Sequence, residues 1–205
     1  MKQKLKLYFA PSACSLAPHI ALREAVMEFN LEKVDIRAGK TASGENYGDI
    51  NPLGYVPALQ LPDGSILTEA VAILLYIADQ KPEIGLAPEP KTATRYQLYR
   101  WLTFISSEIH KGFGPLFNPA LPEEQKNMTI ERLKKRFAFI DKYLEGRTWL
   151  VGDSFTIADI YMFVCLSWTN HMQIDLSPWK NIQSFLTRVG ERSAVREALA
   201  AEQQP

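Results

Sequence analysis

The first 80 residues alternate between strand and helix patterns, whereas the rest of the chain shows only helical periodicity. The elements expected in this first part are strands at 5–9, 30–36, 56–61 and 65–68 and helices at 15–25 and 69–80. The turn sequence Pro62-Asp63-Gly64 joins the last two strands into a hairpin. With one weak helical turn expected in the polar segment 37–50, the order β-α-β-(α)-β-β-α predicts a small mixed sheet with helices packed on it.

A proline-rich segment separates this α/β region from the helical one. Residues 81–91 carry three prolines and little periodicity, which is typical of a linker. The helices expected beyond it span 92–112, 122–145, 157–171, 178–191 and 193–202 and form an all-α bundle. We therefore predict one domain at 1–81, a linker at 82–91 and an all-helical domain at 92–205.

Charge and composition narrow the function classes. The 205 residues include 23 basic and 23 acidic side chains without a Lys/Arg-rich run, which argues against nucleic acid or an anionic membrane surface as a partner. No apolar stretch approaches the about 18 residues of a membrane span and no signal-peptide pattern is present, so a cytoplasmic location is expected. Cys14 and Cys165 are expected to be free thiols. The cysteines and histidines lack metal-ligand spacing, so no metal site is expected.

Cys14 is the residue whose position most directly suggests chemistry. It follows the first strand and lies at the start of the helix expected at 15–25. Because backbone N–H groups at a helix N-terminus stabilise negative charge, a cysteine there tends towards the thiolate. A thioredoxin-type dithiol would need a second cysteine at the position that Ala17 occupies. The site therefore has one cysteine, which acts with an external thiol or not by sulfur chemistry.

Three further segments allow a structural and a functional interpretation. Val56-Pro57 is an ordinary strand-start proline, or a cis proline that exposes the backbone N–H and C=O of Val56 to a peptide-like ligand. Thr68 or Glu69 caps the helix that follows, or Glu69 binds the ammonium group of a ligand whose carboxylate meets the helix N–H groups. His110 is a histidine at the surface or with its hydrogen bonds satisfied by the protein, or it faces a thiol and donates a hydrogen bond to it.

One pattern in the second half is interpreted as structural. Thr156 and Asp159 have the spacing of a capping box at the start of the helix 157–171. Cys165 on that helix is expected to be buried and inert. Trp168 on the same helix is a candidate for lining a cavity.

Together these motifs resemble the bacterial beta-class glutathione S-transferases over almost the entire chain. The matching motifs are Tyr8-Phe9-Ala10-Pro11-Ser12-Ala13-Cys14-Ser15-Leu16, Asn51-Pro52-Leu53-Gly54-Tyr55-Val56-Pro57-Ala58-Leu59, Leu67-Thr68-Glu69, Glu108-Ile109-His110-Lys111-Gly112-Phe113 and Phe155-Thr156-Ile157-Ala158-Asp159. The cysteine and histidine motifs together are specific to that class. The others are shared more widely among glutathione transferases.

The resemblance implies a thioredoxin-like N-terminal domain, an all-helical C-terminal domain and a homodimer. It also implies that glutathione is bound over Cys14, that His110 assists the sulfur, and that the bound tripeptide contacts a set of further residues. The glutathione-binding residues so implied are Cys14, Val56, Pro57, Glu69, Ala70, Thr103, Ser107, Glu108, His110 and Lys40. The expected second substrate is a hydrophobic electrophile, for which Phe113 and Trp168 are the candidate contacts.

The chain departs from the family pattern at three of these positions. A lysine usual in relatives aligns with Gly39, so the neighbouring Lys40 is its candidate substitute. Ala70 lacks the hydroxyl of the serine found in some relatives, and Thr103 replaces an asparagine and can supply only part of the bonding capacity of an amide.

Three functions are compatible with this pattern. The first is a detoxifying transferase that lowers the thiol pKa of bound glutathione and conjugates it to electrophiles. The second is a glutathione-dependent thiol-disulfide oxidoreductase or peroxidase that forms a mixed disulfide with Cys14. The third is a non-catalytic ligand-binding protein on the same scaffold.

Overall fold

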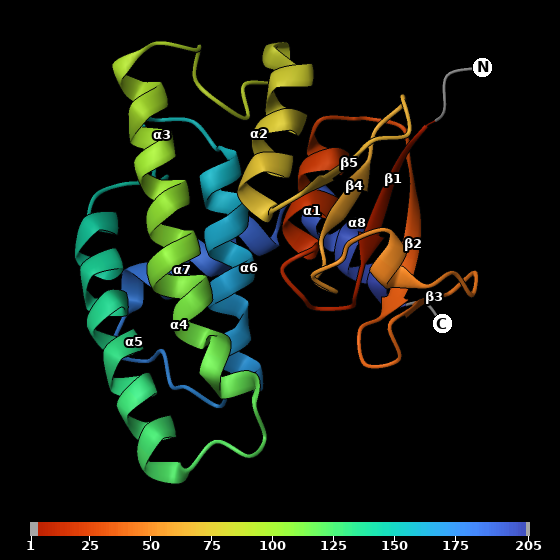
Figure 1. The fold of residues 1–205 in the computed structure, drawn as a ribbon. Coiled ribbons are helices and arrows are strands. Elements are labelled where there is room, and N and C mark those ends of the chain that lie inside the picture. Colours follow the sequence, from red (N-terminus) through yellow and green to blue (C-terminus); the bar gives the residue numbers. More distant parts are fainter. Residues whose placement is uncertain (1–3, 204–205) are drawn as a thin grey trace. The chain divides into compact units, whose positions relative to one another are not determined.

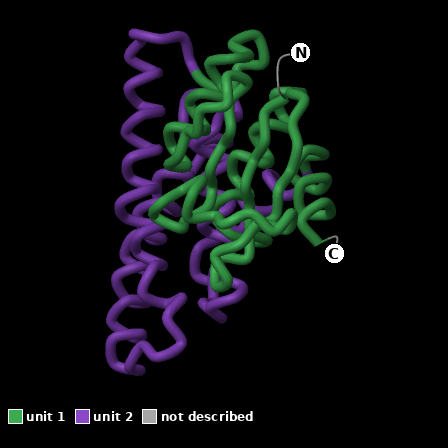
Figure 2. Tube along the Cα trace, turned by 45° about the vertical axis from the view of Figure 1, so that its right-hand side comes forward, with its two compact units in different colours: residues 1–87, 192–205 green, residues 88–191 purple. Residues whose placement is uncertain are grey.

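The computed structural model describes residues 4–203, which divide into two compact units. Unit 1 consists of Met1–Ala87 together with Arg192–Pro205, and unit 2 consists of Pro88–Glu191 (Figure 2). The unit boundary at residue 87 falls inside the segment expected as the linker. The segment from Arg192 onward, expected in the helical domain, belongs instead to unit 1.

Unit 1 is built on the mixed sheet that the sequence predicts. Its strands are β1 (Leu5–Phe9), β2 (Phe29–Asp35), β3 (Lys40–Thr41), β4 (Ala58–Gln60) and β5 (Ile66–Thr68), in the spatial order β3-β2-β1-β4-β5. The central strand β1 pairs parallel with β2 and antiparallel with β4, and β4 forms the predicted hairpin with β5. This confirms the thioredoxin-like α/β fold of the first part of the chain. The carboxyl end of β1 leads into the loop that carries Cys14.

Within the described residues, three α-helices complete unit 1. They are α1 (Leu16–Glu24), α2 (Ala70–Gln80) and α8 (Ser193–Glu202), accompanied by the 3-10 turns η1 (Tyr47–Asp49) and η2 (Pro82–Ile84). Helix α1 packs against both α2 and α8 (Figure 1). Helix α8 belongs here because it buries Val195 and Ala198 and because Arg192 pairs with Glu24 of α1.

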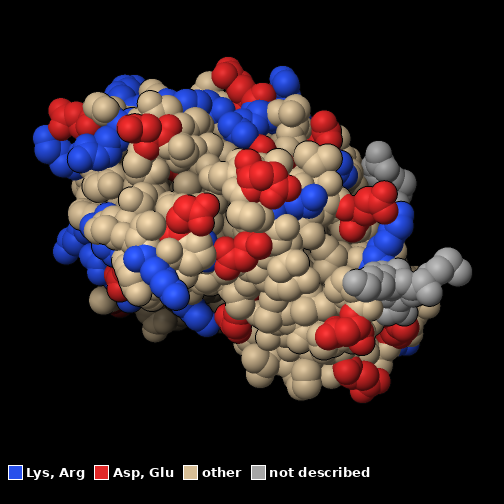
Figure 3. Space-filling view, turned by 90° about the horizontal axis from the view of Figure 1, so that it is seen from above, with Lys and Arg blue, Asp and Glu red and all other residues tan. Residues whose placement is uncertain are grey.

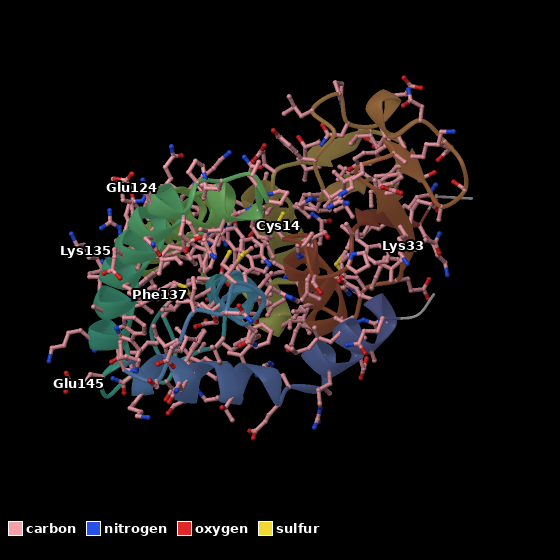
Figure 4. The ribbon with its side chains drawn as sticks, turned by 90° about the horizontal axis from the view of Figure 1, so that it is seen from below. Cys14, Lys33, Glu124, Lys135, Phe137 and Glu145 are labelled. Carbon is pink, nitrogen blue, oxygen red and sulfur yellow. The ribbon has the colours of Figure 1, made fainter. Side chains whose placement is uncertain are left out.

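Unit 2 is all-helical. Its elements are α3 (Ala93–Phe104), a π-helical turn η3 (Ile105–His110), α4 (Lys111–Phe113), a 3-10 turn η4 (Gly114–Phe117), α5 (Glu123–Leu144), α6 (Ile157–His171) and α7 (Lys180–Gly190). Helix α6 packs against α3, α7 and η3, and 12 of its 15 residues are buried. Helix α5 is amphipathic: Phe137 points into unit 2, while Glu124 and Lys135 lie on its outer face (Figure 4).

The start of α6 carries the predicted capping box. The Asp159 carboxylate accepts hydrogen bonds from the backbone N–H of Thr156 (2.8 Å) and of Leu150 (2.9 Å), and also from the Thr156 hydroxyl. Burial raises the pKa of Asp159 to about 6, although these donors pull it in the opposite direction. The buried carboxylate thereby ties the loop before α6 to the helix, and the helix in turn places Tyr161 and Trp168.

The surface carries both signs of charge. On the face shown in Figure 3, acidic and basic side chains are interspersed. Within residues 4–203, no helix has the length and apolar character needed to cross a bilayer.

Candidate functional site

The loop between β1 and α1 holds Cys14 in a compact turn. The Ser15 side chain, which is fully buried, accepts a hydrogen bond from the backbone N–H of Ala10 and donates one to its carbonyl, each at 3.2 Å. The carbonyls of Ala13 and Cys14 accept hydrogen bonds from the backbone N–H groups of Leu16 and Ala17, each at 3.1 Å, so the turn that carries Cys14 runs directly into α1. Cys14 therefore lies at the N-terminal end of α1, as the sequence predicts (Figure 4).

The ionisation expected for Cys14 is corrected by its surroundings. Burial raises the pKa of the Cys14 thiol to about 12, and the negative charge of Glu69 acts in the same direction. The backbone N–H groups of Cys14 and Ser15 lower it, as a helix terminus should, but burial outweighs them. The protonated thiol donates a hydrogen bond to the carbonyl of Val56 at 3.1 Å. In this structure Cys14 is a neutral hydrogen-bond donor.

The loop that carries Val56 contains a cis peptide bond and is held by two side chains of unit 1. The Val56–Pro57 peptide bond is cis, as one of the two interpretations of this dipeptide expected. The carbonyl of Tyr55 accepts hydrogen bonds from the hydroxyl of Tyr47 at 2.8 Å and from the side-chain amide of Asn51 at 2.7 Å. The structure thus joins Cys14 and Val56 directly.

Glu69 lies at the junction of β5 and α2 in an unusual backbone conformation. Its φ of 68° and ψ of 119° are costly for a residue with a side chain, and such strain is found preferentially at functional sites. Among the described residues its carboxylate makes no capping hydrogen bond to α2, and the residue is exposed. The capping interpretation of Glu69 is therefore wrong, whereas the next residue, Ala70, is buried as the first residue of the helix.

Lys40 lies at the edge of the sheet in unit 1. It is exposed on β3, where its backbone pairs with Asp35 of β2. The preceding Gly39 has a φ of +66° in the turn between these strands, a conformation that suits glycine better than a residue with a side chain.

Glu202 of α8 also holds the loop that carries Cys14. The two carboxylate oxygens of Glu202 accept hydrogen bonds from the backbone N–H of Ser12 (3.1 Å) and from Nδ1 of His19 (3.0 Å). Because Nε2 of His19 accepts from Arg23 at 3.0 Å, we assign the ring proton to Nδ1. Sequence reasoning missed this contact, since a separation of 190 residues leaves no local pattern.

In unit 2, the predicted residues follow one another along a single helical run. Thr103 belongs to α3, while Ser107, Glu108 and His110 belong to the π-helical turn, a feature that often marks functional sites. The Ser107 hydroxyl donates to the Thr103 carbonyl at 2.9 Å. The Glu108 carboxylate accepts from Arg136 of α5 at 2.7 Å, so it is already part of an ion pair.

His110 is held by aromatic neighbours. Its Nδ1 lies 2.6 Å from the hydroxyl of Tyr161, and its ring meets Trp168 edge to face with centroids 5.0 Å apart. Burial, together with the positive charge of Lys111, lowers the pKa of His110 to about 4. The imidazole is therefore neutral and has one N–H to donate.

The aromatic residues expected to meet a second substrate differ in exposure. Trp168 is 3% exposed, and Phe113, which is fully buried, packs against it edge to face. The ring that covers Trp168 and remains 53% exposed is Phe117 of η4, which the sequence did not single out. Phe113 is thus a support for Trp168 rather than a surface for a ligand.

Comparison with known proteins decides the family. A model of the glutathione S-transferase N-terminal domain matches residues 3–79, and a model of the C-terminal domain matches residues 104–193. The chain belongs to the glutathione S-transferase family.

Individual relatives of this glutathione S-transferase agree. It is 42% identical over 198 residues to glutathione S-transferase GstA of Escherichia coli O157:H7, covering 97% of this chain and 98% of the relative. It superposes with a TM-score of 0.95 on a sphingomonad glutathione S-transferase complexed with glutathione, at 46% identity over 98% of this chain and 100% of the other. A beta-class enzyme from Sphingomonas chungbukensis is 45% identical, with a TM-score of 0.94 and coverage of 97% and 98%. The beta-class resemblance is confirmed.

The predicted residues of this glutathione S-transferase form one set in each unit. Unit 1 carries Cys14, Val56, Pro57, Glu69, Ala70 and Lys40, and unit 2 carries Thr103, Ser107, Glu108, His110, Phe113 and Trp168. Sequence reasoning missed the residues that hold these in place, namely Tyr47, Asn51, Glu202, Arg136 and Tyr161. In residues 4–203 no group of three or more His, Cys, Asp or Glu is arranged to hold a metal ion.

Proposed function

We propose that this protein is a glutathione S-transferase that conjugates reduced glutathione to hydrophobic electrophiles. The observation that carries the proposal is that the Cys14 thiol keeps its proton, which it donates to the carbonyl of Val56 in this structure and can turn to a sulfur bound beside it. A cysteine that keeps its proton stabilises a neighbouring thiolate by donating a hydrogen bond, whereas attack on a disulfide requires it to ionise first. The same geometry therefore favours glutathione as the sulfur that ionises and reacts.

We further propose that unit 1 binds the tripeptide. The backbone of Val56, after cis Pro57, pairs with the cysteinyl residue, and the strained, exposed Glu69 with the N–H of Ala70 holds the γ-glutamyl end. Lys40 is the available cation for the glycine carboxylate. In the domain scheme that we propose, residues 1–81 form the glutathione-binding domain and 82–91 the linker.

The helical part supplies the remaining groups in this proposal. Thr103, Ser107 and Glu108 border the tripeptide, and neutral His110 donates its one N–H to sulfur. The half-exposed Phe117, which packs edge to face on the buried Trp168, offers aromatic surface to the electrophile. Each unit of thiol pKa lowering corresponds to about 1.4 kcal/mol of preferential thiolate stabilisation.

We also propose a homodimer, in the cytoplasm and with a role in detoxification. The support for the dimer is a set of large exposed apolar side chains on two helices of unit 2. They are Tyr96 (62% exposed) of α3 and Met128 (67%) and Phe139 (50%) of α5. Apolar surface of this kind is typical of interfaces.

A comparison of two single variants tests the function. Cys14→Ala should retain measurable conjugation of glutathione to 1-chloro-2,4-dinitrobenzene but give no mixed disulfide with glutathione by intact mass. Cys165→Ala, which removes the buried thiol of α6, is the matched control and should keep both properties. If Cys14→Ala lost conjugation as well as the mixed disulfide, the result would contradict the proposal and favour the redox alternative. Glutathione binding without any conjugation in the unmodified protein would favour the ligand-binding alternative.

A further inference from the structure

Two buried side chains bind one carbonyl of an otherwise exposed loop. The carbonyl of Tyr55 accepts from Tyr47 (2.8 Å) and from Asn51 (2.7 Å), whose side chains belong to residues that are only 1% and 4% exposed. Within the same loop, the side chains of Leu53 and Tyr55 are 66% and 65% exposed. In an exposed loop the carbonyl of Tyr55 could accept its hydrogen bonds from water, so it does not need two buried donors. We therefore interpret the two donors as fixing the direction in which this carbonyl points.

The fixed carbonyl determines where the next N–H points. The Tyr55–Val56 peptide is planar and trans, so its C=O and N–H point to opposite edges of one plane. Holding the oxygen of Tyr55 from the core side therefore aims the N–H of Val56 the other way. The following carbonyl, that of Val56, is the one that meets the Cys14 thiol at 3.1 Å.

The two donors are themselves rigid. Tyr47 lies in η1, and its ring packs in the core beside Tyr8, with centroids 5.8 Å apart. The backbone N–H of Asn51 bonds the Tyr47 carbonyl at 2.9 Å, and its side-chain oxygen accepts from Leu53 at 3.2 Å. Burial also raises the pKa of Tyr47 to about 12, so its hydroxyl keeps the proton that it donates.

We propose that Tyr47 and Asn51 are positioning residues for glutathione, which act by aiming the N–H of Val56 at the carbonyl of the cysteinyl residue. This inference rests on the proposed function, in which that N–H is a glutathione contact. Neither side chain touches the tripeptide. Their effect reaches the ligand through one peptide plane, and it concerns only ligands that carry the cysteinyl carbonyl.

The test pairs two tyrosines with two ligands. Tyr47→Phe keeps the ring in the core and removes only the hydroxyl. Tyr8→Phe removes a hydroxyl from the adjacent core ring, whose own partner is Lys6, and is the matched control. Each protein is titrated with glutathione and, by competition, with γ-glutamylcysteamine, which keeps the γ-glutamyl group and the thiol but lacks the cysteinyl carbonyl.

For Tyr47→Phe we expect the Kd of glutathione to rise roughly three- to tenfold, the scale of one lost hydrogen bond, with less than about a twofold change for γ-glutamylcysteamine. The KM for glutathione should rise with kcat nearly unchanged. Tyr8→Phe should leave both ligands unaffected. Adding Asn51→Leu to Tyr47→Phe should increase the loss for glutathione alone.

An equal loss for both ligands in Tyr47→Phe would mean general weakening of the loop and would overturn the proposal. So would an unchanged Kd for glutathione. A thermal melt of each variant shows whether it is folded. If the unmodified protein failed to bind glutathione, the proposed function would fall, and this inference with it. That outcome is distinct from a variant that binds as the unmodified protein does.

Discussion

The hydroxyl of Tyr161 lies 2.6 Å from Nδ1 of His110, and the two rings meet edge to face with centroids 5.8 Å apart. Tyr161 is almost completely buried in α6, so its position is set by the helix core. A neutral imidazole carries one ring proton, and a partner at one nitrogen decides which nitrogen has it. Since Tyr161 occupies Nδ1, the proposed contact of His110 with the glutathione sulfur would use Nε2, which carries the ring proton when the Tyr161 hydroxyl donates to Nδ1.

The first prediction concerns this pair. Tyr161→Phe should lower kcat for conjugation roughly three- to tenfold because His110 loses the partner that orients it. The KM for glutathione should change little. Tyr143→Phe, which removes a hydroxyl that bonds the Leu150 carbonyl in the same unit, is the control and should leave kcat intact. Equal losses in the two variants, measured by steady-state kinetics, would show that the effect is one of stability alone.

The second prediction concerns the reactivity of Cys14. With a thiol pKa near 12, its alkylation by iodoacetamide should be slow at pH 7.5 and should accelerate about tenfold per pH unit up to pH 10. Glu69→Gln should speed the reaction, because removing that negative charge lowers the pKa of Cys14. Mass spectrometry of the modified peptide follows the rate in a Cys165→Ala background. A rate that levels off below pH 8 would contradict the burial argument.

The third prediction is a pair of opposite pH effects on stability. Asp159, raised from 3.8 to about 6 in the folded state, stabilises the fold below pH 4, and this contribution is lost as pH rises through 6. His110, lowered from 6.5 to about 4, stabilises it above pH 6.5, and this contribution is lost as pH falls through 4.

Urea unfolding at pH 4.5 and 6.5 separates the two contributions. The difference in unfolding free energy between the unmodified protein and Asp159→Asn should shrink as pH rises. The difference from His110→Gln should grow. Parallel changes in the two comparisons would show that the ionisation states assigned here are incorrect.

The fourth prediction uses a strained turn at the end of α1. Met27 N–H bonds the Leu22 carbonyl and Val26 N–H bonds the Arg23 carbonyl, a pattern that usually places glycine at the position of Val26. Val26 has a φ of 51° and is 80% exposed, so its β-branched side chain bears the cost without packing. Val26→Gly should raise the unfolding free energy by about 0.5–1 kcal/mol.

Thermal denaturation checks this expectation. A change of that size corresponds to roughly 1–4 °C in Tm for a protein of this length. Val26→Ala is the control, because alanine keeps the Cβ that the left-handed conformation disfavours. A similar rise in Val26→Ala would point to the lost exposed side chain rather than to the backbone.

The fold was largely predictable from local patterns. The expected bounds of α6 and α8, 157–171 and 193–202, agree with the structure because the capping box and the amphipathic spacing are written in neighbouring residues. A π-helical turn at Ile105–His110 interrupts the helix expected at 92–112. The sequence pattern does not reveal this turn, because one additional residue per turn hardly changes the spacing of the apolar residues. The assignment of residues 192–205 to unit 1 depends on distant contacts that no local pattern shows.

The candidate site was predictable only in part. Motifs placed Cys14, Val56 and His110, and the structure bonds the first two to each other. The charge state of Cys14 was not predictable, because the helix terminus is visible in the sequence and the depth of burial is not. The sequence did not indicate Tyr47 and Tyr161, because each contributes through a single hydroxyl whose partner lies elsewhere in the chain.

The carboxylate of Glu202 that holds Ser12 and His19 has a consequence for how the molecule is made. Unit 1 is discontinuous, so during synthesis the strand and loop made first wait for the α8 segment while all of Pro88–Glu191 is translated. At about 5–20 residues per second this interval lasts on the order of ten seconds. The nascent chain is thus exposed to chaperones with its cysteine loop unfinished until the α8 segment has been made.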